Sequence, residues 1–253
     1  MKLEQISYLY GLLITDGYLV NNKEYEYLSI ELQELDREFL ERLSKYFQCH
    51  LYSRTRNTNF KEDFSSIRLT ISDNKIIEKI LQMGFPKENK TLNAAPPITE
   101  YSEKDFWRGV IDGDGSLGIR KRGVYLNLTT KSEFLKNAFV SLVKNITGLE
   151  MNVHRNIRDN IYNLTVTSYN AQKLIKWIYE DSISDFYLPR KYEKYLEIKD
   201  LNIKSRVAPK KWTIEEIEYL NTHSNEECIR YLNRTLRAIQ QKRYLLRKES
   251  RNE

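Results

Sequence analysis

Two aspartates, Asp16 and Asp114, occupy the same place in two similar segments of the chain and could act together in catalysis. Each acid closes an apolar run that ends in Asp-Gly, over Leu9–Gly17 and Trp107–Gly115, and the two acids are 98 residues apart. A single Asp-Gly pair usually marks only a turn. Its repetition in matched surroundings indicates a duplicated unit with one acid in each copy.

Packing of the two apolar segments as paired helices would bring the acids together. Gly11 and Gly109 lack a Cβ atom and would let the two backbones approach closely. Leu12 and Val110 would supply apolar contacts beside them. The acids would then meet at the partially negative C-terminal ends of both helices, where the helix dipoles and mutual repulsion disfavour ionised carboxylates. A divalent cation would offset both penalties, so the pattern predicts a site for Mg²⁺ or for a similar ion such as Mn²⁺.

Metal-assisted hydrolysis of a phosphodiester fits such a site, because a bound cation lowers the pKa of the attacking water and stabilises the leaving oxygen. A calcium loop is the competing interpretation, since Asp112–Ser116 resembles the opening of one. Its twelfth position would be Gly123, where calcium requires a bidentate glutamate. The sequence therefore argues against an EF-hand.

The basic charge of the chain is concentrated near its end. The net charge is +6 over 253 residues, and residues 205–253 carry 11 Lys or Arg against 7 Asp or Glu. This distribution is typical of nucleic-acid binding. Cys49 and Cys228 are isolated and the three histidines are scattered, which argues against a disulfide framework, a zinc site and a serine-type triad.

Composition predicts a folded protein, with 40% apolar and 12% aromatic residues. No apolar run approaches the roughly 20 residues of a membrane span. The beginning of the chain lacks the pattern of a signal peptide. We expect a cytoplasmic protein without a membrane partner.

The repeat extends into the elements that must position the acids. Tyr27–Gln33 and Tyr125–Thr129 alternate apolar with polar residues as half-buried strands do. A helical stretch follows each strand and shares the sequence Glu-Phe-Leu, and a second strand pattern comes at Leu69–Ser72 and Leu164–Thr167. Each copy therefore predicts helix, two strands, helix, two strands, helix. The fold class is α+β, with two pseudo-symmetric αββαββα lobes and four-stranded antiparallel sheets.

The domain organisation follows from the prolines and the charge. We predict a first lobe over 1–84, a linker over 85–101, a second lobe over 102–203, a further linker over 204–211 and a small all-α domain over 212–253. Thr213 and Glu216 have the spacing of a capping box at the start of that domain. Its basic third helix is typical of a helix-turn-helix or Myb-like DNA reader, although a solvated basic helix is the plain alternative.

With these motifs, the region from Ser7 to Asp200 resembles the LAGLIDADG homing endonucleases in their single-chain, two-motif form. The resemblance implies that Asp16 and Asp114 bind metal and that the carbonyls of Thr15 and Gly113 also contact it. It further implies that the motif helices form the lobe interface. It also implies a monomer whose two sheets lie in successive major grooves of double-stranded DNA and whose acids cut both strands, leaving short 3′ overhangs. The sixth motif position departs from the family's Asp in the first copy, where Ile14 stands opposite Asp112, so we expect asymmetry there.

The resemblance also suggests supporting residues. Gln33 and a counterpart, Thr129, would orient water, and Lys90 and Lys191 would lie near the scissile phosphates; a plain surface role is the alternative for each. Outward-facing side chains of the strands are expected to contact DNA: Tyr27, Ser29, Gln33, Arg54, Arg56, Arg68 and Thr70 in the first lobe, and Arg120, Arg122, Tyr125, Asn127, Asn163 and Thr165 in the second. In the last domain the expected contacts are Arg234, Arg237, Lys242 and Arg243.

Two rival functions remain open. A LAGLIDADG scaffold joined to a helix-turn-helix also occurs in transcriptional regulators without nuclease activity, although the presence of both acids argues against that class. An RNA maturase would use the same basic surface, formed by the two saddle-shaped sheets, to hold an intron. Our leading hypothesis is a site-specific, metal-dependent DNA endonuclease.

Overall fold

The computed structural model describes residues 1–22, 25–56, 64–121, 123–181, 186–204 and 211–249. The chain divides into two compact units, Met1–Ser205 and Arg206–Glu253. In the described part of the chain, no helix is both long and apolar enough to cross a membrane.

The first half of unit 1 is an αββαββα lobe. Its elements are α1 (Leu3–Asp16), β1 (Gly17–Asn21), β2 (Glu26–Gln33), the short 3₁₀ helix η1 (Glu34–Asp36), α2 (Arg37–Phe47), β3 (His50–Arg56), β4 (Phe64–Ile71) and α3 (Asn74–Gln82). The strands form one antiparallel sheet in the order β1-β2-β4-β3.

The second half repeats this arrangement after the short helix α4 (Lys90–Asn93). Its elements are α5 (Glu103–Asp114), β5 (Gly115–Arg120), β6 (Gly123–Thr130), α6 (Glu133–Thr147), β7 (Arg155–Asn156), β8 (Ile161–Thr167), α7 (Ser168–Tyr179) and α8 (Pro189–Lys199). The sheet order β5-β6-β8-β7 is the same as in the first lobe. The predicted α+β class and two-lobe architecture are confirmed.

Hydrophobic alternation builds these sheets. In β6 the side chains of Val124, Leu126 and Leu128 are buried, and the residues between them are half-buried on the other face. Because successive strand side chains point to opposite faces, one face joins the core and the other stays polar. Ser132 starts α6 by accepting a hydrogen bond from the Leu135 amide, and the helix ends at Gly148 in the left-handed conformation, with φ of 77°.

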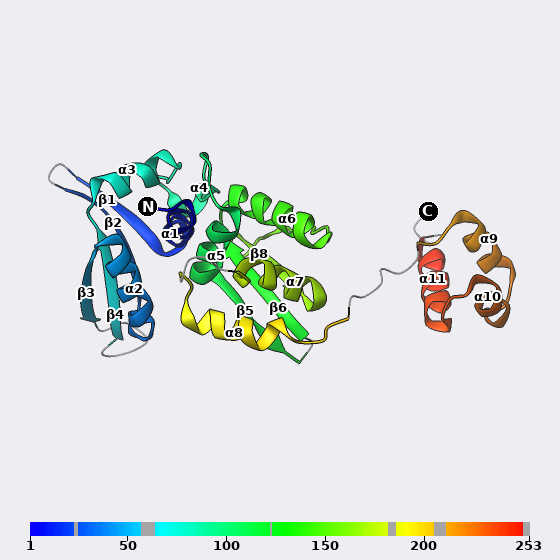
Figure 1. Cartoon of the computed structure of the whole chain (residues 1–253). Helices are drawn as coiled ribbons and strands as arrows, with labels where there is room; N and C mark the ends of the chain where they lie inside the picture. The colour runs from blue at the N-terminus through cyan, green and yellow to red at the C-terminus, as the bar shows by residue number, and fades with distance from the viewer. Residues whose placement is uncertain (23–24, 57–63, 122, 182–185, 205–210, 250–253) are drawn as a thin grey trace. The chain divides into compact units, whose positions relative to one another are not determined.

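Helices α1 and α5 lie side by side at the centre of unit 1, with one sheet to each side (Figure 1). A single hydrophobic core runs through both lobes and includes both motif helices. The lobes therefore form one folded body around the helix pair.

Unit 2 consists of α9 (Ile214–Thr222), α10 (Asn225–Leu232) and α11 (Leu236–Glu249). Its small core is built from Leu220, Cys228, Leu232 and Ile239. Thr213 accepts from the Glu216 amide at 3.2 Å, and Glu216 accepts from the Thr213 amide at 3.1 Å, which completes the capping box.

Candidate active site

Two glycines let the motif helices approach each other at backbone distance. A Cβ atom on Gly11 would lie 2.2 Å from the Phe106 carbonyl oxygen, and one on Gly109 would lie 2.3 Å from that of Tyr8. Leu12 and Val110 are fully buried beside this crossing. The structure thus places all four expected interface residues in the contact between the lobes.

Asp16 and Asp114 are the last residues of α1 and α5. A Cβ atom on Gly113 would lie 2.5 Å from Oδ2 of Asp16, so this carboxylate lies against the last turn of the other lobe's motif helix. Burial and repulsion from Asp114 raise the pKa of Asp16 to about 6. Burial likewise raises the pKa of Asp114. The two acids are therefore electrostatically coupled across the lobe interface.

A lysine caps the end of each motif helix. The Lys191 amine donates to the carbonyls of Ile111 and Asp112, both at 2.6 Å, and also to those of Gly113 and Gly115. Lys191 is buried, and burial lowers its pKa to about 8.

The amine of Lys90, which lies on α4 between the lobes, occupies the matching position at the end of α1. It donates to the carbonyls of Thr15 at 2.5 Å and Leu13 at 3.3 Å, and also to that of Gly17. Burial lowers the pKa of Lys90. In this structure both amines therefore bond carbonyls at the ends of the motif helices, including those of Thr15 and Gly113. The helix dipole favours a cation at this end of a helix.

The sixth motif position is asymmetric in structure as in sequence. The buried Asp112 carboxylate accepts hydrogen bonds from the hydroxyls of Tyr8 at 2.8 Å and Tyr179 at 2.6 Å. It also accepts from the Leu188 amide at 2.8 Å, directly before α8. Asp112 thereby fixes the start of the helix that carries Lys191, whereas Ile14 simply packs in the core. Tyr8 and Tyr179 come from distant parts of the sequence and carry no motif that could have identified them.

Each acid opens into its own small pocket. A pocket of about 270 Å³ is lined by Asp16, Glu31, Gln33 and residues of the other lobe, including Gly113 and Arg190. A second pocket of about 230 Å³ is lined by Asp114, Thr129 and Lys131 of the second lobe, Thr15 of the first lobe and Lys90 of α4. Both pockets combine one lobe's strand end with the opposite lobe's motif helix.

Strand register corrects the expected pairing of Gln33 with Thr129. Gly17 pairs with Ile30 and Gly115 with Leu128, so the 98-residue offset of the acids also holds in the sheets. Thr129 therefore corresponds to Glu31, and the counterpart of Gln33 is Lys131, which lies just beyond the end of β6. The same offset, applied to the sequence, would have identified Lys131.

The polar faces of the sheets carry most of the expected DNA-contacting side chains. Arg54, Asn163, Thr165, Arg120 and Gln33 are exposed, and Tyr27, Arg68, Thr70, Tyr125 and Asn127 are half-buried. Arg54 and Arg68 both pair with the Glu31 carboxylate, at 3.2 and 3.0 Å. Arg120 lies over the Tyr125 ring, 3.7 Å from its centroid. The side chain of Arg56 and all of Arg122 lie outside the described residues.

Ser29 is a correction to this set. Its side chain is fully buried and its hydroxyl donates to the Leu69 carbonyl at 3.1 Å. Ser29 lies between Tyr18 on β1 and Thr70 on β4, so its short side chain is covered by larger neighbours on the same face.

Two of the four expected contacts in unit 2 serve its own packing. Arg234 forms a nearly buried ion pair with Glu216 at 2.6 Å and lies over the Trp212 ring. Arg243 donates to the carbonyl of His223. These bonds hold both guanidinium groups within unit 2, and their contact with DNA stays a prediction. Arg237 is exposed and Lys242 half-buried on the third helix.

The donor chemistry at the helix ends suits a hard divalent cation. The two carboxylates and the carbonyls of Thr15 and Gly113 present only oxygen atoms, which Mg²⁺ prefers. A bound cation would offset the repulsion between the acids. Among the described residues there is no group of three or more His, Cys, Asp or Glu that could hold a metal, so any such ion would complete its shell with water or substrate oxygens.

Comparison with known proteins supports this architecture. Residues 102–179 match a family model described as a LAGLIDADG-like domain. No curated protein matches the sequence significantly.

Homing endonucleases are among the solved structures that resemble this chain. The homing endonuclease I-WcaI bound to its DNA recognition sequence has 16% identity and a TM-score of 0.54, covering 77% of this chain and 86% of that one. Mesophilic variants of the homing endonuclease I-DmoI have 16% identity and a TM-score of 0.52, covering 78% and 99%. At this identity the likeness establishes the fold, which is the two-lobed fold of LAGLIDADG homing endonucleases.

Proposed function

We propose that the protein is a site-specific endonuclease that makes metal-dependent double-strand breaks in DNA. The observation that carries the proposal is the placement of Asp16 and Asp114 at the abutting ends of two paired helices, each in a pocket beside polar strand ends. The chain has two equivalent acids, one for each strand of the DNA duplex. The DNA-bound state of the similar I-WcaI structure adds support.

Asp16 and Asp114 would hold Mg²⁺ or Mn²⁺, together with the carbonyls of Thr15 and Gly113. When bound, such an ion lowers the pKa of the attacking water and stabilises the leaving oxygen. Lys90 and Lys191 act indirectly in this proposal, because they fix the helix ends from which the acids project. A bound cation would offset the electrostatic cost that burial and repulsion from Asp114 impose on the charged Asp16 carboxylate.

Gln33 and Lys131 give the two pockets different chemistry. The Gln33 amide can donate to or accept from water, whereas the Lys131 amine is a cation suited to a phosphate oxygen. The two strands of the duplex would therefore meet unequal sites, and we propose Lys131 as a phosphate-contacting residue beside Asp114.

The polar sheet faces would read the target. Arginines there can contact guanine bidentately, each worth about 1 to 3 kcal/mol of discrimination. Because the two faces carry different residues, such as Arg68 and Thr70 in one and Asn163 and Thr165 in the other, the target should be long and not palindromic. The cuts should leave short 3′ overhangs. Unit 2 would add a helix-turn-helix contact through Arg237 and Lys242.

Selection from a library of randomised DNA tests the activity. Purified protein is incubated with the library and Mg²⁺, and parallel reactions contain EDTA or no protein. We expect discrete double-strand breaks at related, asymmetric sequences in the Mg²⁺ reaction alone. Sequence-specific binding without any cleavage in Mg²⁺ or Mn²⁺ would contradict the proposal and favour the regulator hypothesis.

A further inference from the structure

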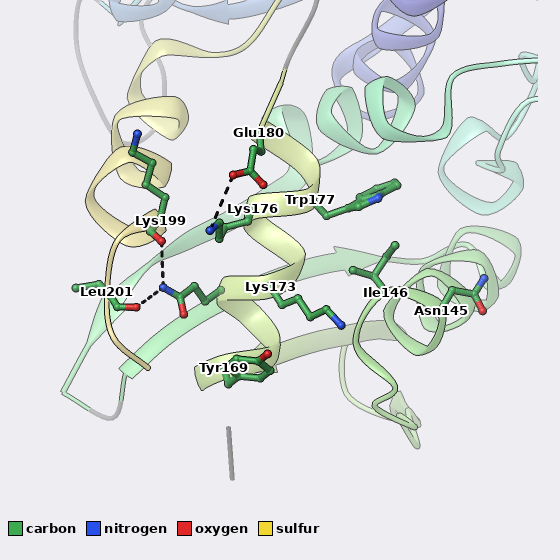
Figure 2. A pocket seen from close by; sticks show the side chains of 10 residues that line it. Asn145, Ile146, Tyr169, Lys173, Lys176, Trp177, Glu180, Lys199 and Leu201 are labelled. Atoms are coloured by element: carbon green, nitrogen blue, oxygen red, sulfur yellow. Dashed lines mark hydrogen bonds and ion pairs between the residues drawn. The ribbon is translucent and has the colours of Figure 1, made fainter. Parts of the chain in front are cut away.

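A groove on the second lobe has the chemistry of a ligand site and shares no residue with the two acid pockets. It encloses about 540 Å³, within the range of small-molecule sites. Its floor is one face of α7, as Figure 2 shows, with Asn145 and Ile146 on one side and Lys199 and Leu201 on the other.

The end of α8 and the segment that follows it form one wall of the groove, and hydrogen bonds hold this wall in place. The Gln172 side-chain amide donates to the carbonyls of Ile198 at 2.9 Å and Leu201 at 2.6 Å, with a longer contact to that of Lys199. Gln172 is buried. The segment after α8 is therefore tied to α7, and the groove has a preformed edge.

The charges around the groove favour an anion. Lys173, Lys176 and Lys199 line it together with a single acid, Glu180. Lys176 lies 3.9 Å from the Glu180 carboxylate, and both side chains are substantially exposed, so their attraction is weak. Two positive charges remain in excess, which suits one or more phosphate groups.

Aromatic rings in the same groove favour a planar ligand group. Tyr169 and Trp177 both line it, and Tyr169 is 37% exposed. The Trp177 ring and the Lys173 amine extend on the side of α6, one helical turn apart (Figure 2). A ring on which a base can stack, next to an amine that can bind phosphate, is the combination that recognises nucleotides.

We propose that this groove binds a nucleotide, with its phosphates on the lysines and its base against the aromatic rings. The same chemistry is offered by a free mononucleotide and by an unpaired nucleotide of a strand. The proposal is independent of the nuclease function, because the acids and both of their pockets lie elsewhere.

Calorimetric titration of the full chain with AMP and ATP in EDTA provides the test, alongside a single-stranded hexanucleotide. We expect one ligand per chain and binding at least tenfold weaker in Lys173→Glu and Lys176→Glu. The charge-matched control is Lys75→Glu, an exposed lysine on α3, which should bind within twofold of wild type. Ligand quenching of tryptophan emission should disappear in Trp177→Phe.

The outcomes separate the two sources of nucleotide. Lysine-dependent binding of AMP or ATP identifies a free nucleotide, and lysine-dependent binding of the hexanucleotide alone identifies a strand. The proposal is overturned if none of the three ligands binds at millimolar concentration. It is also overturned if the ligands that bind wild type bind Lys173→Glu and Lys176→Glu, shown by circular dichroism to be folded, equally tightly.

Discussion

At the scale of single residues, the positions of the two acids lower the stability of the folded protein. Burial and repulsion from Asp114 raise the pKa of Asp16 to about 6, from an ordinary value of 3.8. The folded state therefore holds this proton more tightly than the unfolded chain does. The charged carboxylate consequently lowers stability at neutral pH, which is typical of residues positioned for function.

Asp16→Asn should stabilise the protein at pH 8 in EDTA by about 1 to 2 kcal/mol. The variant removes the free-energy cost of the charged Asp16 carboxylate. This cost is fully present above the folded pKa of about 6 and is lost as the pH falls towards 4. The advantage of the variant should therefore vanish near pH 4. Urea unfolding at both pH values measures it, with Asp200→Asn, an exposed acid, as the matched control. A variant less stable than wild type at pH 8 would refute this electrostatic account.

Lys191→Met should destabilise the fold by about 3 kcal/mol, because it leaves several buried carbonyls at the end of α5 without a charged donor. Lys194 is exposed on α8, the helix that also carries Lys191. Lys194→Met should change the free energy of unfolding by less than about 0.5 kcal/mol. Chemical denaturation at pH 7 compares the two variants. Equal effects would show that Lys191 does not hold the helix end.

At the scale of elements, the paired motif helices determine where both acids lie. Their separation depends on Gly11 and Gly109, at which each backbone touches the other helix. Any side chain there must push the helices apart and with them the acids. The packing of the two helices at the lobe interface therefore also sets the geometry of the site.

Gly11→Ala should destabilise unit 1 by about 3 kcal/mol or more, because its methyl group would lie 2.2 Å from the Phe106 carbonyl oxygen. Gly118→Ala in β5 is the control, since the nearest atom to its methyl group is 3.4 Å away. Thermal unfolding of both variants measures the difference. A Gly11→Ala protein as stable as Gly118→Ala would mean that the helices do not cross so closely.

Sequence periodicity was enough to predict the elements but not all of the site. Alternation along Tyr125–Thr129 and the two Asp-Gly motifs predicted the strands, the duplication and the two-lobe fold, because these patterns are local. The hydrogen bonds of Asp112 with Tyr8 and Tyr179 join positions far apart in sequence, so no local pattern encodes them. Ser29 was misassigned because alternation gives the face of a strand and not the size of its neighbours.

At the scale of the whole molecule, the chain joins two compact units of different character. Unit 1 contains the acids and both sheets, and unit 2 is a three-helix domain with its own small core. In our proposal the second unit adds affinity through effective concentration, without contributing to the chemistry.

Truncation after Lys204 should weaken DNA binding and shorten the protected DNA on one side, with both cut positions unchanged at saturating protein. The slope of log affinity against log salt should become shallower by about one unit for every phosphate that the truncated chain no longer binds. Footprinting and cleavage mapping of the truncated and full chains provide the comparison. An unchanged footprint, or a cut that moves, would contradict this division of roles.

The most direct measurement of the central claim is cleavage of a plasmid that carries the selected target, by wild type, Asp16→Asn and Asp114→Asn, with and without Mg²⁺. Asp200→Asn is the control for the loss of one negative charge. If the two helix-end acids carry the reaction, wild type and the control will linearise the plasmid only with the metal ion. Each active-site variant will then bind the target without making double-strand breaks. Double-strand cleavage by either variant at the wild-type rate would contradict the account.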